Sequence, residues 1–408
     1  MKDLLKKAYN ILDNRFYFKI LYLFVSLTFV TILIDIPGIK IFNTIALAWG
    51  MLLILFMIIE DRKRRKFYKF DIPLIIFMGL TLIFNLTIYI NISNIKIWIV
   101  NLILVSTVFT IDVFKNKKVK IKEMNTITYF YCIFMFIASF ISLCLRFSGK
   151  MVQIGDIPFG GTRGIFVNEN ALSIASAIAI VMCIYLNSIA KNNKLKIFWM
   201  FNIVLQAVTM LGSKGRSALL IVIAVIYLFI FVYYKNKYIR GLLIILPIII
   251  CGSFFALSDE NTIRVFTSGR NSLWTSSSIV IKNNPLTGVG YSDFVEAVKE
   301  ARDTTDLPGL ETGGLHNIYM QTATINGVIC LILLLLFLSM AIFFIIKNLD
   351  GLKRKEKLQM TTITSMLVGI LAVNLFESNL LYVVSFISII FWIYLGYLIS
   401  ILDNKNIE

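Results

Sequence analysis

Apolar runs long enough to cross a membrane recur along the whole chain, and no other feature limits its fold so strongly. A helix needs about 20 mainly apolar residues to span the hydrocarbon core of a bilayer. The chain is 58% hydrophobic and 15% charged, which is not the composition of a soluble domain. We therefore expect an all-α, polytopic membrane protein that forms a single membrane domain over residues 1–408. The runs predict about twelve transmembrane helices, at 18–34, 41–59, 72–90, 95–113, 124–145, 170–190, 197–211, 217–234, 241–257, 318–346, 360–380 and 382–402.

The basic residues predict the orientation of these helices. With the N-terminus inside the cell, the segments on the cytoplasmic side hold 28 of the 40 Lys and Arg residues, as the positive-inside rule expects. Both termini are then cytoplasmic in a multi-pass protein of the plasma (inner) membrane. This bias and the attraction of anionic lipids explain the net charge of +17. Because the basic runs are short loops rather than one face, they do not predict nucleic-acid binding.

Metal-binding side chains are few and scattered. The chain has one histidine, and its five cysteines lie in or beside predicted spans without CxxC spacing. One histidine excludes a histidine cluster for zinc, and the cysteines are better explained as small buried side chains than as ligands or disulfides. We expect no cofactor and no metal.

Three polar segments stand out on the side opposite the basic loops, at 146–169, 212–217 and 258–317. The third lies between the ninth and tenth predicted helices. In it, "SGRNSLWTSSSIVIK" predicts a helix beginning near Ser268, "NPLTGVG" predicts a break, and "YSDFVEAVKEAR" predicts a short helix after Ser292. We expect a partly helical extracytoplasmic loop over 258–317 that caps the site, with flexible coil after Pro308.

All three polar segments contain arginine. Because the positive-inside rule places most basic residues on the cytoplasmic side, arginines on the opposite side need an explanation. One interpretation is an anion clamp, because a guanidinium group binds phosphate oxygens through paired hydrogen bonds. In "GSKGRSALL", a tight turn also directs the N–H groups of a helix N-terminus outward. The alternative is that each cation reaches lipid headgroups or pairs with a loop carboxylate such as Glu169 or Asp259. The cations are Arg163, Arg216, Arg264 and Arg270, with Lys214 beside Arg216.

The single histidine lies where the third polar segment meets an apolar one. His316 and Asn317 open the tenth predicted span, and a helix N-terminus disfavours imidazolium, so a neutral imidazole there can accept a proton. Asn317, Gln321 and Thr324 give this entry a polar stripe. Gly327 lies three helical turns after His316 on nearly the same face, where a neighbour can pack closely. The alternative is an interfacial histidine hydrogen-bonded to lipid or to the loop.

The stretch "NENALSIASAIAI" predicts another helix start. Asn168 or Asn170 is suited to the N-cap position, and the small residues that follow suit close packing of the helix. Such a start would place Arg163 on a rigid element.

The chain contains four motifs in this order: "RGIFVNENALSIA", "GSKGRSALL", "GRNSLW" followed by "NPLTGVGYSDF", and "HNIYMQTATINGV", in which nine residues separate His-Asn from Gly. Together they resemble the O-antigen ligase and O-unit polymerase (Wzy-type) superfamily of bacterial polysaccharide assembly. The resemblance covers about 160–330, and Cys330 departs from it because the family commonly has a small or hydroxyl residue there. It implies an integral glycosyltransferase of the C-type membrane architecture, with its active site on the extracytoplasmic face.

The resemblance also implies roles for individual residues. Arg163, Arg216 and Arg270 would hold the diphosphate of a glycan linked to undecaprenyl diphosphate, and His316 would orient or deprotonate the acceptor hydroxyl. A neutralised diphosphate is a competent leaving group without a metal, since electrostatic stabilisation supplies most of the catalysis. The catalytic candidates are thus His316, Arg216 and Arg270, and the substrate-binding candidates are Arg163, Lys214, Arg264, Asn317 and Asn170. Expected partners are the lipid-linked glycan, membrane lipids and other membrane proteins of polysaccharide assembly.

Three functions stay open on the sequence alone. The richness in Ile, Lys and Asn suggests an AT-rich genome and favours a capsule, exopolysaccharide or O-antigen polymerase, which transfers the glycan to another lipid-linked repeat unit. The first alternative is an O-antigen ligase with a lipid or other acceptor. The second is a transporter or flippase of lipid-linked glycans, for which charges near mid-membrane and internal symmetry are expected. Glu377 is nearly the only deep acidic candidate, and it also fits the outer end of the eleventh span.

Overall fold

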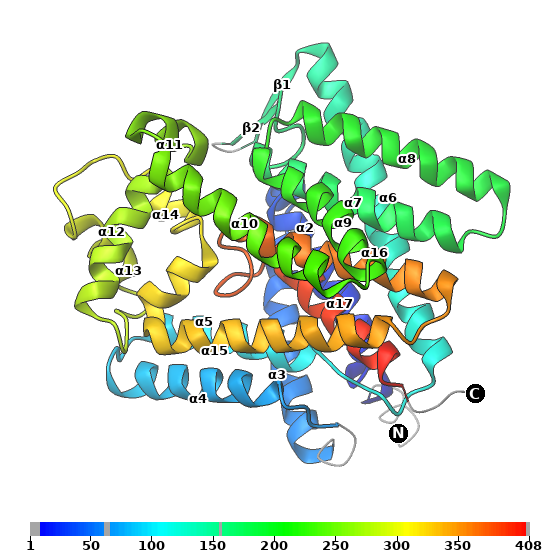
Figure 1. Ribbon diagram of the computed structural model, residues 1–408, viewed down its shortest axis with the longest axis horizontal. Coiled ribbons are helices and arrows are strands. Elements are labelled where there is room, and N and C mark those ends of the chain that lie inside the picture. The colour runs from blue at the N-terminus through cyan, green and yellow to red at the C-terminus, as the bar shows by residue number, and fades with distance from the viewer. Residues whose placement is uncertain (1–8, 61–65, 155–156, 405–408) are drawn as a thin grey trace.

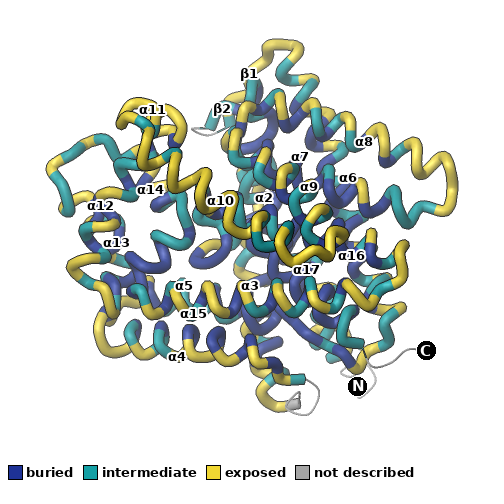
Figure 2. The backbone as a smooth tube through the Cα atoms, in the orientation of Figure 1, coloured by how far each residue is buried: buried dark blue, intermediate teal, exposed yellow. Residues whose placement is uncertain are grey.

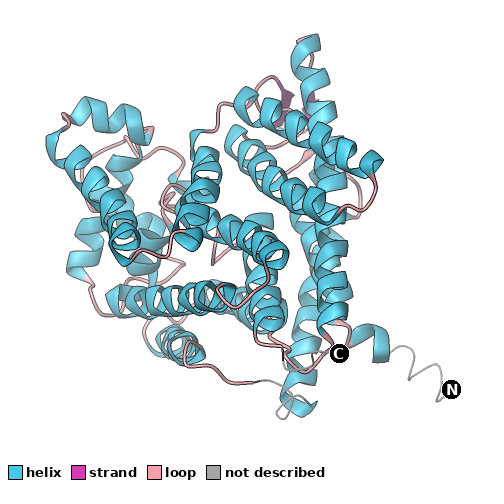
Figure 3. Ribbon diagram, turned by 45° about the vertical axis from the view of Figure 1, so that its right-hand side comes forward, coloured by secondary structure: helices cyan, strands magenta, loops and turns pink. Residues whose placement is uncertain are grey.

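Helices form most of the computed structural model, which describes residues 9–60, 66–154 and 157–404 (Figure 1, Figure 3). Parts of the basic segments expected on the cytoplasmic side, at 1–8, 61–65 and 405–408, lie outside the described residues, as do 155–156 of the first polar segment. The structure also contains a short hairpin of two antiparallel strands, β1 (Met151–Ile154) and β2 (Ile157–Gly160), which departs from the all-α expectation. The fold is otherwise helical, as expected.

Each of the twelve predicted spans coincides with a helix in the described part of the chain. Seven of these helices are long and apolar enough to cross a membrane: α3, α6, α7, α8, α9 with the 3₁₀ turn before it, α10 and α15. The total of twelve spans stays a prediction, because the other five helices are shorter or less apolar. The twelve are α2 (Arg15–Phe29), α3 (Ile39–Glu60), α4 (Asp71–Thr87), α5 (Ile92–Ile103), α6 (Lys117–Ser148), α7 (Glu169–Ile189), α8 (Asn193–Gly212), α9 (Leu219–Tyr233), α10 (Lys237–Leu257), α15 (Ile318–Leu349), α16 (Arg354–Val373) and α17 (Phe386–Leu402).

Asparagine side chains begin many of these helices. An asparagine at the N-cap accepts a hydrogen bond from a backbone N–H group of the first turn, which otherwise has no partner within the helix. The capping residues are Asn14, Asn91, Asn116, Asn168, Asn192, Asn236 and Asn317. Of these residues, the sequence alone predicted Asn168 and Asn317 at helix starts.

Burial differs sharply between two of the apolar helices (Figure 2). Every described side chain of α17 from Phe386 to Ile401 is buried, and Gly396 allows its backbone to approach that of Thr110. In contrast, α10 has no buried residue, although its sequence is equally suited to a membrane. The apolar surface of α10 is therefore available to lipid, while α17 forms part of the core of the bundle.

The connection between α16 and α17 corrects the predicted ends of the last two spans. We expected 360–380 and 382–402 to be nearly continuous helices, but α16 ends at Val373 and α17 starts at Phe386. Asn374 ends α16 because its side-chain oxygen accepts a hydrogen bond from Asn379 N at 2.9 Å. Residues 374–385 then lie near the middle of the molecule (Figure 1). Glu377 consequently lies in a buried turn rather than in a helix.

Helix α15 is broken at Gly327, which corrects the expectation of one continuous span over 318–346. Its φ of 83° and ψ of 168° are outside the helical region and suit only glycine. The segment 284–290 fits into the break: Val289 N donates to Thr324 O at 3.0 Å, and Val328 N donates to Pro285 O at 2.7 Å. The close packing expected at Gly327 is thus made by the backbone of "NPLTGVG".

The third polar segment contains four helices, α11 (Glu260–Thr267), α12 (Arg270–Asn283), α13 (Phe294–Glu300) and α14 (Leu310–Gly313). Helices α12 and α13 confirm the two predicted there, whereas α11 was not predicted and α14 replaces part of the expected coil. Asp259 caps α11, and hydrogen bonds from Thr262 lower the pKa of its carboxyl group. Ser277 of α12 contacts Thr324 of α15 through their hydroxyl groups at 2.7 Å, so this segment packs directly on the membrane helices.

Candidate functional site

A buried carboxylate, Glu377, lies at the centre of the candidate site. Its side chain is 9% exposed, and three polar side chains from distant parts of the chain face it. Arg270 Nη2 lies 3.2 Å from Oε1, Asn170 Nδ2 donates to the same oxygen at 3.0 Å, and His316 Nδ1 lies 3.5 Å from Oε2. A buried carboxylate is stable only with such partners, because its desolvation is otherwise costly. Three of the predicted site residues therefore meet at one carboxylate.

Arg270 occupies the first position of α12. The turn before it requires left-handed backbone at Ser268 (φ 59°) and Gly269 (φ 77°), which directs the side chain of Arg270 toward 374–385. Besides Glu377, its guanidinium group donates to the carbonyl oxygen of Phe376. At 12% exposure the side chain is largely withdrawn from solvent, so its charge acts in an environment of reduced dielectric.

His316 is held in an unusual backbone conformation next to glycines. Its φ is 47°, a left-handed value that non-glycine residues seldom adopt. The imidazole lies against Gly309 and Gly313, and a Cβ atom added at Gly309 would be 2.9 Å from Nε2. These glycines thus provide the space for the ring. Strained conformations of this kind are often found at functional sites.

The two ring nitrogens of His316 differ in their surroundings. Nδ1 is buried and faces Glu377 Oε2, without a well-directed hydrogen bond to any described group. A carboxylate on this side favours the tautomer with the proton on Nδ1, which leaves the lone pair of Nε2 able to accept a proton. The arrangement is suited to general-base chemistry at Nε2.

Asn317 has a structural role next to the imidazole. Its side-chain oxygen accepts hydrogen bonds from Tyr319 N and Met320 N, both at 3.0 Å, and so caps α15. Its own N–H group donates to Ser378 Oγ at 3.1 Å. Asn317 therefore joins the start of α15 to the 374–385 segment and fixes His316 relative to Glu377.

Arg216 lies beside this group of residues rather than inside it. Its Nη2 atom donates to Ser268 Oγ at 2.6 Å and to Val265 O at 3.2 Å, and the side chain is exposed. The turn that carries it packs on the start of α7, since a Cβ atom at Gly215 would be 3.1 Å from the Cα of Asn170. Arg216 thus contacts the turn between α11 and α12, directly before Arg270.

The remaining predicted cations contact the loops. Arg163 Nη1 is 3.5 Å from the carbonyl oxygens of Pro158 and Val167. Arg264 pairs with Asp306 at 3.1 Å, and both side chains are well exposed, which agrees with the alternative of a loop ion pair. Lys214 is exposed in the turn before Arg216, with a left-handed φ of 62°.

A cavity of about 510 Å³ reaches Gly313, against which the imidazole lies, although His316 itself does not line it. Gly314, Ser378, Gln321 and Tyr382 also line it. Its other walls come from residues 91–93, 291–295, 310–312 and 379–383 and contain hydroxyl, amide and carboxylate groups. The cavity offers hydrogen-bonding partners to a polar molecule near the start of α15.

Sequence reasoning identified Asn170, Arg270 and His316 but not the residue that joins them. Glu377 was recognised only as an isolated acid in an apolar region, because its partners are distant in sequence. The sequence signal for Glu377 was its position alone among apolar residues, since a carboxylate in such a region needs a partner.

The bundle of apolar helices, together with the cations and the imidazole grouped around Glu377, defines an integral membrane protein with a polar, charged site at one end of its helices. Residues 201–335 match the family model described as O-antigen ligase. This match confirms the resemblance to the O-antigen ligase and polymerase superfamily and supports a membrane enzyme of the ligase or polymerase type. The matched segment extends from α8 into α15 and includes Arg216, Arg270 and His316, whereas Asn170 and Glu377 lie outside it.

A relative from Haemophilus influenzae (strain ATCC 51907 / DSM 11121 / KW20 / Rd) is described only as an uncharacterized protein. It is 27% identical over 359 residues, which cover 80% of this chain and 85% of the relative. The similarity therefore extends beyond the matched segment to most of both chains.

Proposed function

We propose that the protein is a polysaccharide polymerase that transfers a glycan from undecaprenyl diphosphate to the acceptor sugar of another lipid-linked repeat unit. The observation that supports this most directly is the grouping of Arg270, His316 and Asn170 around Glu377, with Arg216 at the adjoining turn. The site pairs cations suited to a diphosphate with an imidazole suited to a hydroxyl group. The family match supports the class of reaction.

Arg216 and Arg270 are the proposed diphosphate ligands. As the bond between the anomeric carbon and the diphosphate breaks, negative charge develops on the leaving oxygen, and guanidinium groups stabilise it. Arg270 is paired with Glu377 before the donor arrives, so its orientation is fixed in advance. Arg216 is exposed, and its hydrogen bonds to Ser268 and Val265 hold it at the turn before Arg270.

His316 is the proposed general base. The acceptor hydroxyl oxygen attacks the anomeric carbon, its proton moves to Nε2, and undecaprenyl diphosphate departs, so charge and atoms balance without another reactant. Glu377 faces Nδ1 and stabilises the imidazolium that forms. The cavity lined by Gly313, Gln321 and Ser378 is the proposed position of the acceptor sugar.

The second candidate is an O-antigen ligase, which uses the same donor. The matching family, which is described as O-antigen ligase, supports this candidate. The two enzymes differ in the acceptor, which is another lipid-linked repeat unit for a polymerase and a different lipid-linked molecule for a ligase. The composition of the chain favours the polymerase.

The experiment that tests the proposal incubates the purified protein with a defined lipid-linked repeat unit, alone and with a lipopolysaccharide-core acceptor, and separates the products on a gel. A ladder formed from the repeat unit alone supports the polymerase. A single product that requires the second acceptor supports the ligase. No covalent product under either condition, together with movement of the lipid-linked glycan across vesicles, would overturn the proposal in favour of transport.

A further inference from the structure

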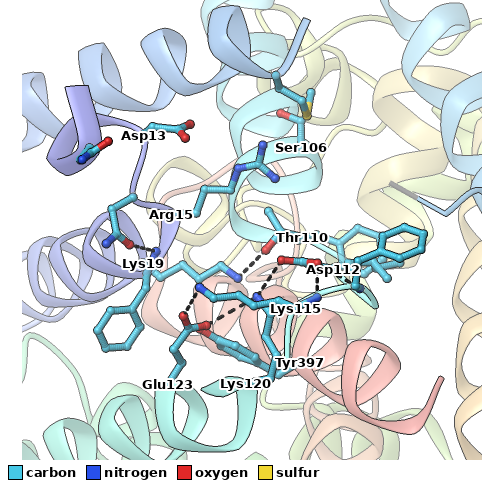
Figure 4. Close-up of a pocket in the computed structure, with 17 residues that line it drawn as sticks. Asp13, Arg15, Lys19, Ser106, Thr110, Asp112, Lys115, Lys120, Glu123 and Tyr397 are labelled. Carbon is cyan, nitrogen blue, oxygen red and sulfur yellow. Dashed lines mark hydrogen bonds and ion pairs between the residues drawn. The ribbon is translucent and has the colours of Figure 1, made fainter. Parts of the chain in front are cut away.

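Figure 4 shows a second cavity, of about 800 Å³. Glu377 lies in the turn before α17, whereas Tyr397 near the other end of this helix lines the cavity, so the two sites lie toward opposite ends of α17. The walls of the cavity are the start of α2, the π-helical turn η3 (Leu104–Val108) with the loop after it, and the start of α6. Tyr397 near the end of α17 completes it, and Asn404 Nδ2 donates to Lys115 O at 2.8 Å to hold these elements together. The distribution of Lys and Arg predicts that this end is cytoplasmic.

Two of the lysines that line this cavity are neutralised by carboxylates. Lys115 Nζ lies 2.7 Å from Glu123 Oε1, and Lys120 Nζ lies 3.5 Å from Glu123 Oε2 and 3.4 Å from Asp112 Oδ2. Figure 4 shows these pairs along one wall. Their charges are balanced within the protein.

Lys19 is different. Its side chain is buried, with 2% exposure, and its ammonium group faces the cavity (Figure 4). Nζ donates to the neutral hydroxyl of Thr110 at 2.6 Å and lies 4.5 Å from the ring centre of Tyr397. Among the described residues, no carboxylate oxygen lies within 4.0 Å of it. Glu123 also lines the cavity and attracts this ammonium from a greater distance, but it is already paired with Lys115 and Lys120. A buried ammonium with no carboxylate of the described residues in contact is costly, so an anion from outside the protein would stabilise it.

We propose that this cavity binds a phosphate-bearing anion, with Lys19 as its main cationic ligand. Arg15 also lines the cavity, and a guanidinium group pairs well with two oxygens of one phosphate. The start of α2 and the start of α6 border the membrane on the predicted cytoplasmic side, where anionic phospholipids gather at basic pockets between helices. The phosphate belongs either to such a lipid headgroup or to a soluble phosphate compound. This inference does not depend on the proposed glycosyl transfer.

Thermal unfolding of the purified full-length protein in detergent tests the proposal. One series adds short-chain phosphatidylglycerol, with phosphatidylcholine of the same chain length as its control, and a second adds inorganic phosphate or pyrophosphate. Binding to the folded protein raises Tm, because the free energy of unfolding increases with the logarithm of one plus the ratio of ligand concentration to Kd. A rise with phosphatidylglycerol alone identifies a lipid headgroup, and a rise with the inorganic anions identifies a soluble ligand.

The variants Lys19→Met and Lys118→Met form a matched pair. Lys118 is exposed at the start of α6 and does not line the cavity. In Lys19→Met the affinity for the phosphate ligand should fall about tenfold or more, as expected for the loss of a charged hydrogen-bond donor, whereas Lys118→Met should behave as wild type. Without ligand, Lys19→Met should be at least as stable as wild type, because a buried charge has been removed.

Two results would overturn this inference. One is that neither phosphatidylglycerol nor the inorganic anions raise the Tm of the wild-type protein. The other is that Lys19→Met keeps the wild-type affinity. Should Lys19→Met fail to fold, Arg15→Gln serves as the second variant, and an unchanged affinity in that protein likewise counts against the site.

Discussion

Arg270 and Glu377 form an ion pair between the start of α12 and the turn after α16, with Nη2 and Oε1 3.2 Å apart. The pair balances the charge of Arg270 before any substrate is present. The other carboxylate oxygen of Glu377 faces His316, so one carboxylate positions both the proposed diphosphate ligand and the proposed base. Its negative charge also opposes the binding of a diphosphate nearby. Glu377 therefore helps to orient Arg270 and His316 but weakens the binding of the diphosphate.

These two opposing effects predict that Glu377→Gln lowers both kcat and the KM for the donor. The amide keeps the size of the side chain and can still accept hydrogen bonds, but it no longer stabilises an imidazolium at His316. We expect kcat to fall by about 10²-fold, within the range of general-base effects, while KM for the donor falls because a repulsive charge is removed. Steady-state assays with a lipid-linked repeat unit measure both constants.

The matched control for this variant is Glu300→Gln. Glu300 is an exposed carboxylate at the end of α13, and it does not line the cavity proposed for the acceptor sugar. We expect wild-type kinetics from it. Equal kcat values for Glu377→Gln and Glu300→Gln would show that Glu377 has no part in the reaction.

The arginines should separate into two groups. Arg216→Ala and Arg270→Ala each remove a proposed diphosphate ligand, and we expect losses of about 10²–10³ in kcat, as for other donors that stabilise a leaving or oxyanion charge. Arg264→Ala breaks an exposed ion pair with Asp306 and should change the rate by less than about threefold. Product formation by membranes with equal amounts of each variant makes the comparison. Three similar losses would contradict the assignment of Arg264 to the loop.

The proposed role of His316 predicts a selective effect on chemistry. In His316→Ala the rate of transfer should fall by about 10²–10⁴, because the proposed general base is removed. The Kd of the donor should change little, since the imidazole is assigned to the acceptor. Single-turnover measurements and equilibrium binding of a labelled donor separate the two steps. A variant with unchanged turnover would leave the histidine with a structural role only.

The break in α15 predicts an effect on stability. At Gly327 a Cβ atom would collide with the carbonyl oxygen of Leu286, and the backbone conformation excludes other residues. Gly327→Ala should lower the free energy of unfolding by about 2 kcal/mol or more. The control is Gly79→Ala in α4, where no atom lies within 4 Å of the added Cβ and alanine should stabilise the helix by up to about 1 kcal/mol. Thermal unfolding in detergent measures both. A Gly327→Ala protein as stable as the Gly79→Ala protein would contradict this account.

The helices could be predicted well because their causes are local. Apolar runs of sufficient length must satisfy their own backbone hydrogen bonds in a membrane, and Asn168 marked the start of α7. The start of α6 was predicted at Met124 rather than at Lys117, because its first two turns are polar and basic. Other errors occurred where a contact distant in sequence decided the conformation. Nearly all of residues 374–385 were predicted to belong to the last two membrane spans. Instead, hydrogen bonds from Ile318 N to Asn374 O and Glu377 O join this turn to the start of α15.

The same distinction applies to the candidate site. The sequence alone determined that the protein is a helical membrane protein, that three polar segments opposite the basic loops contain arginines and the single histidine, and that the motifs in these segments resemble those of a known family in their order. Only the tertiary structure decided which of those cations share a site: Arg270 and His316 meet at Glu377, Arg216 lies beside them, and Arg264 pairs within the loop. The physical reason is that apolarity and capping act over a few residues, whereas the pairing of buried charges depends on which distant segments pack together.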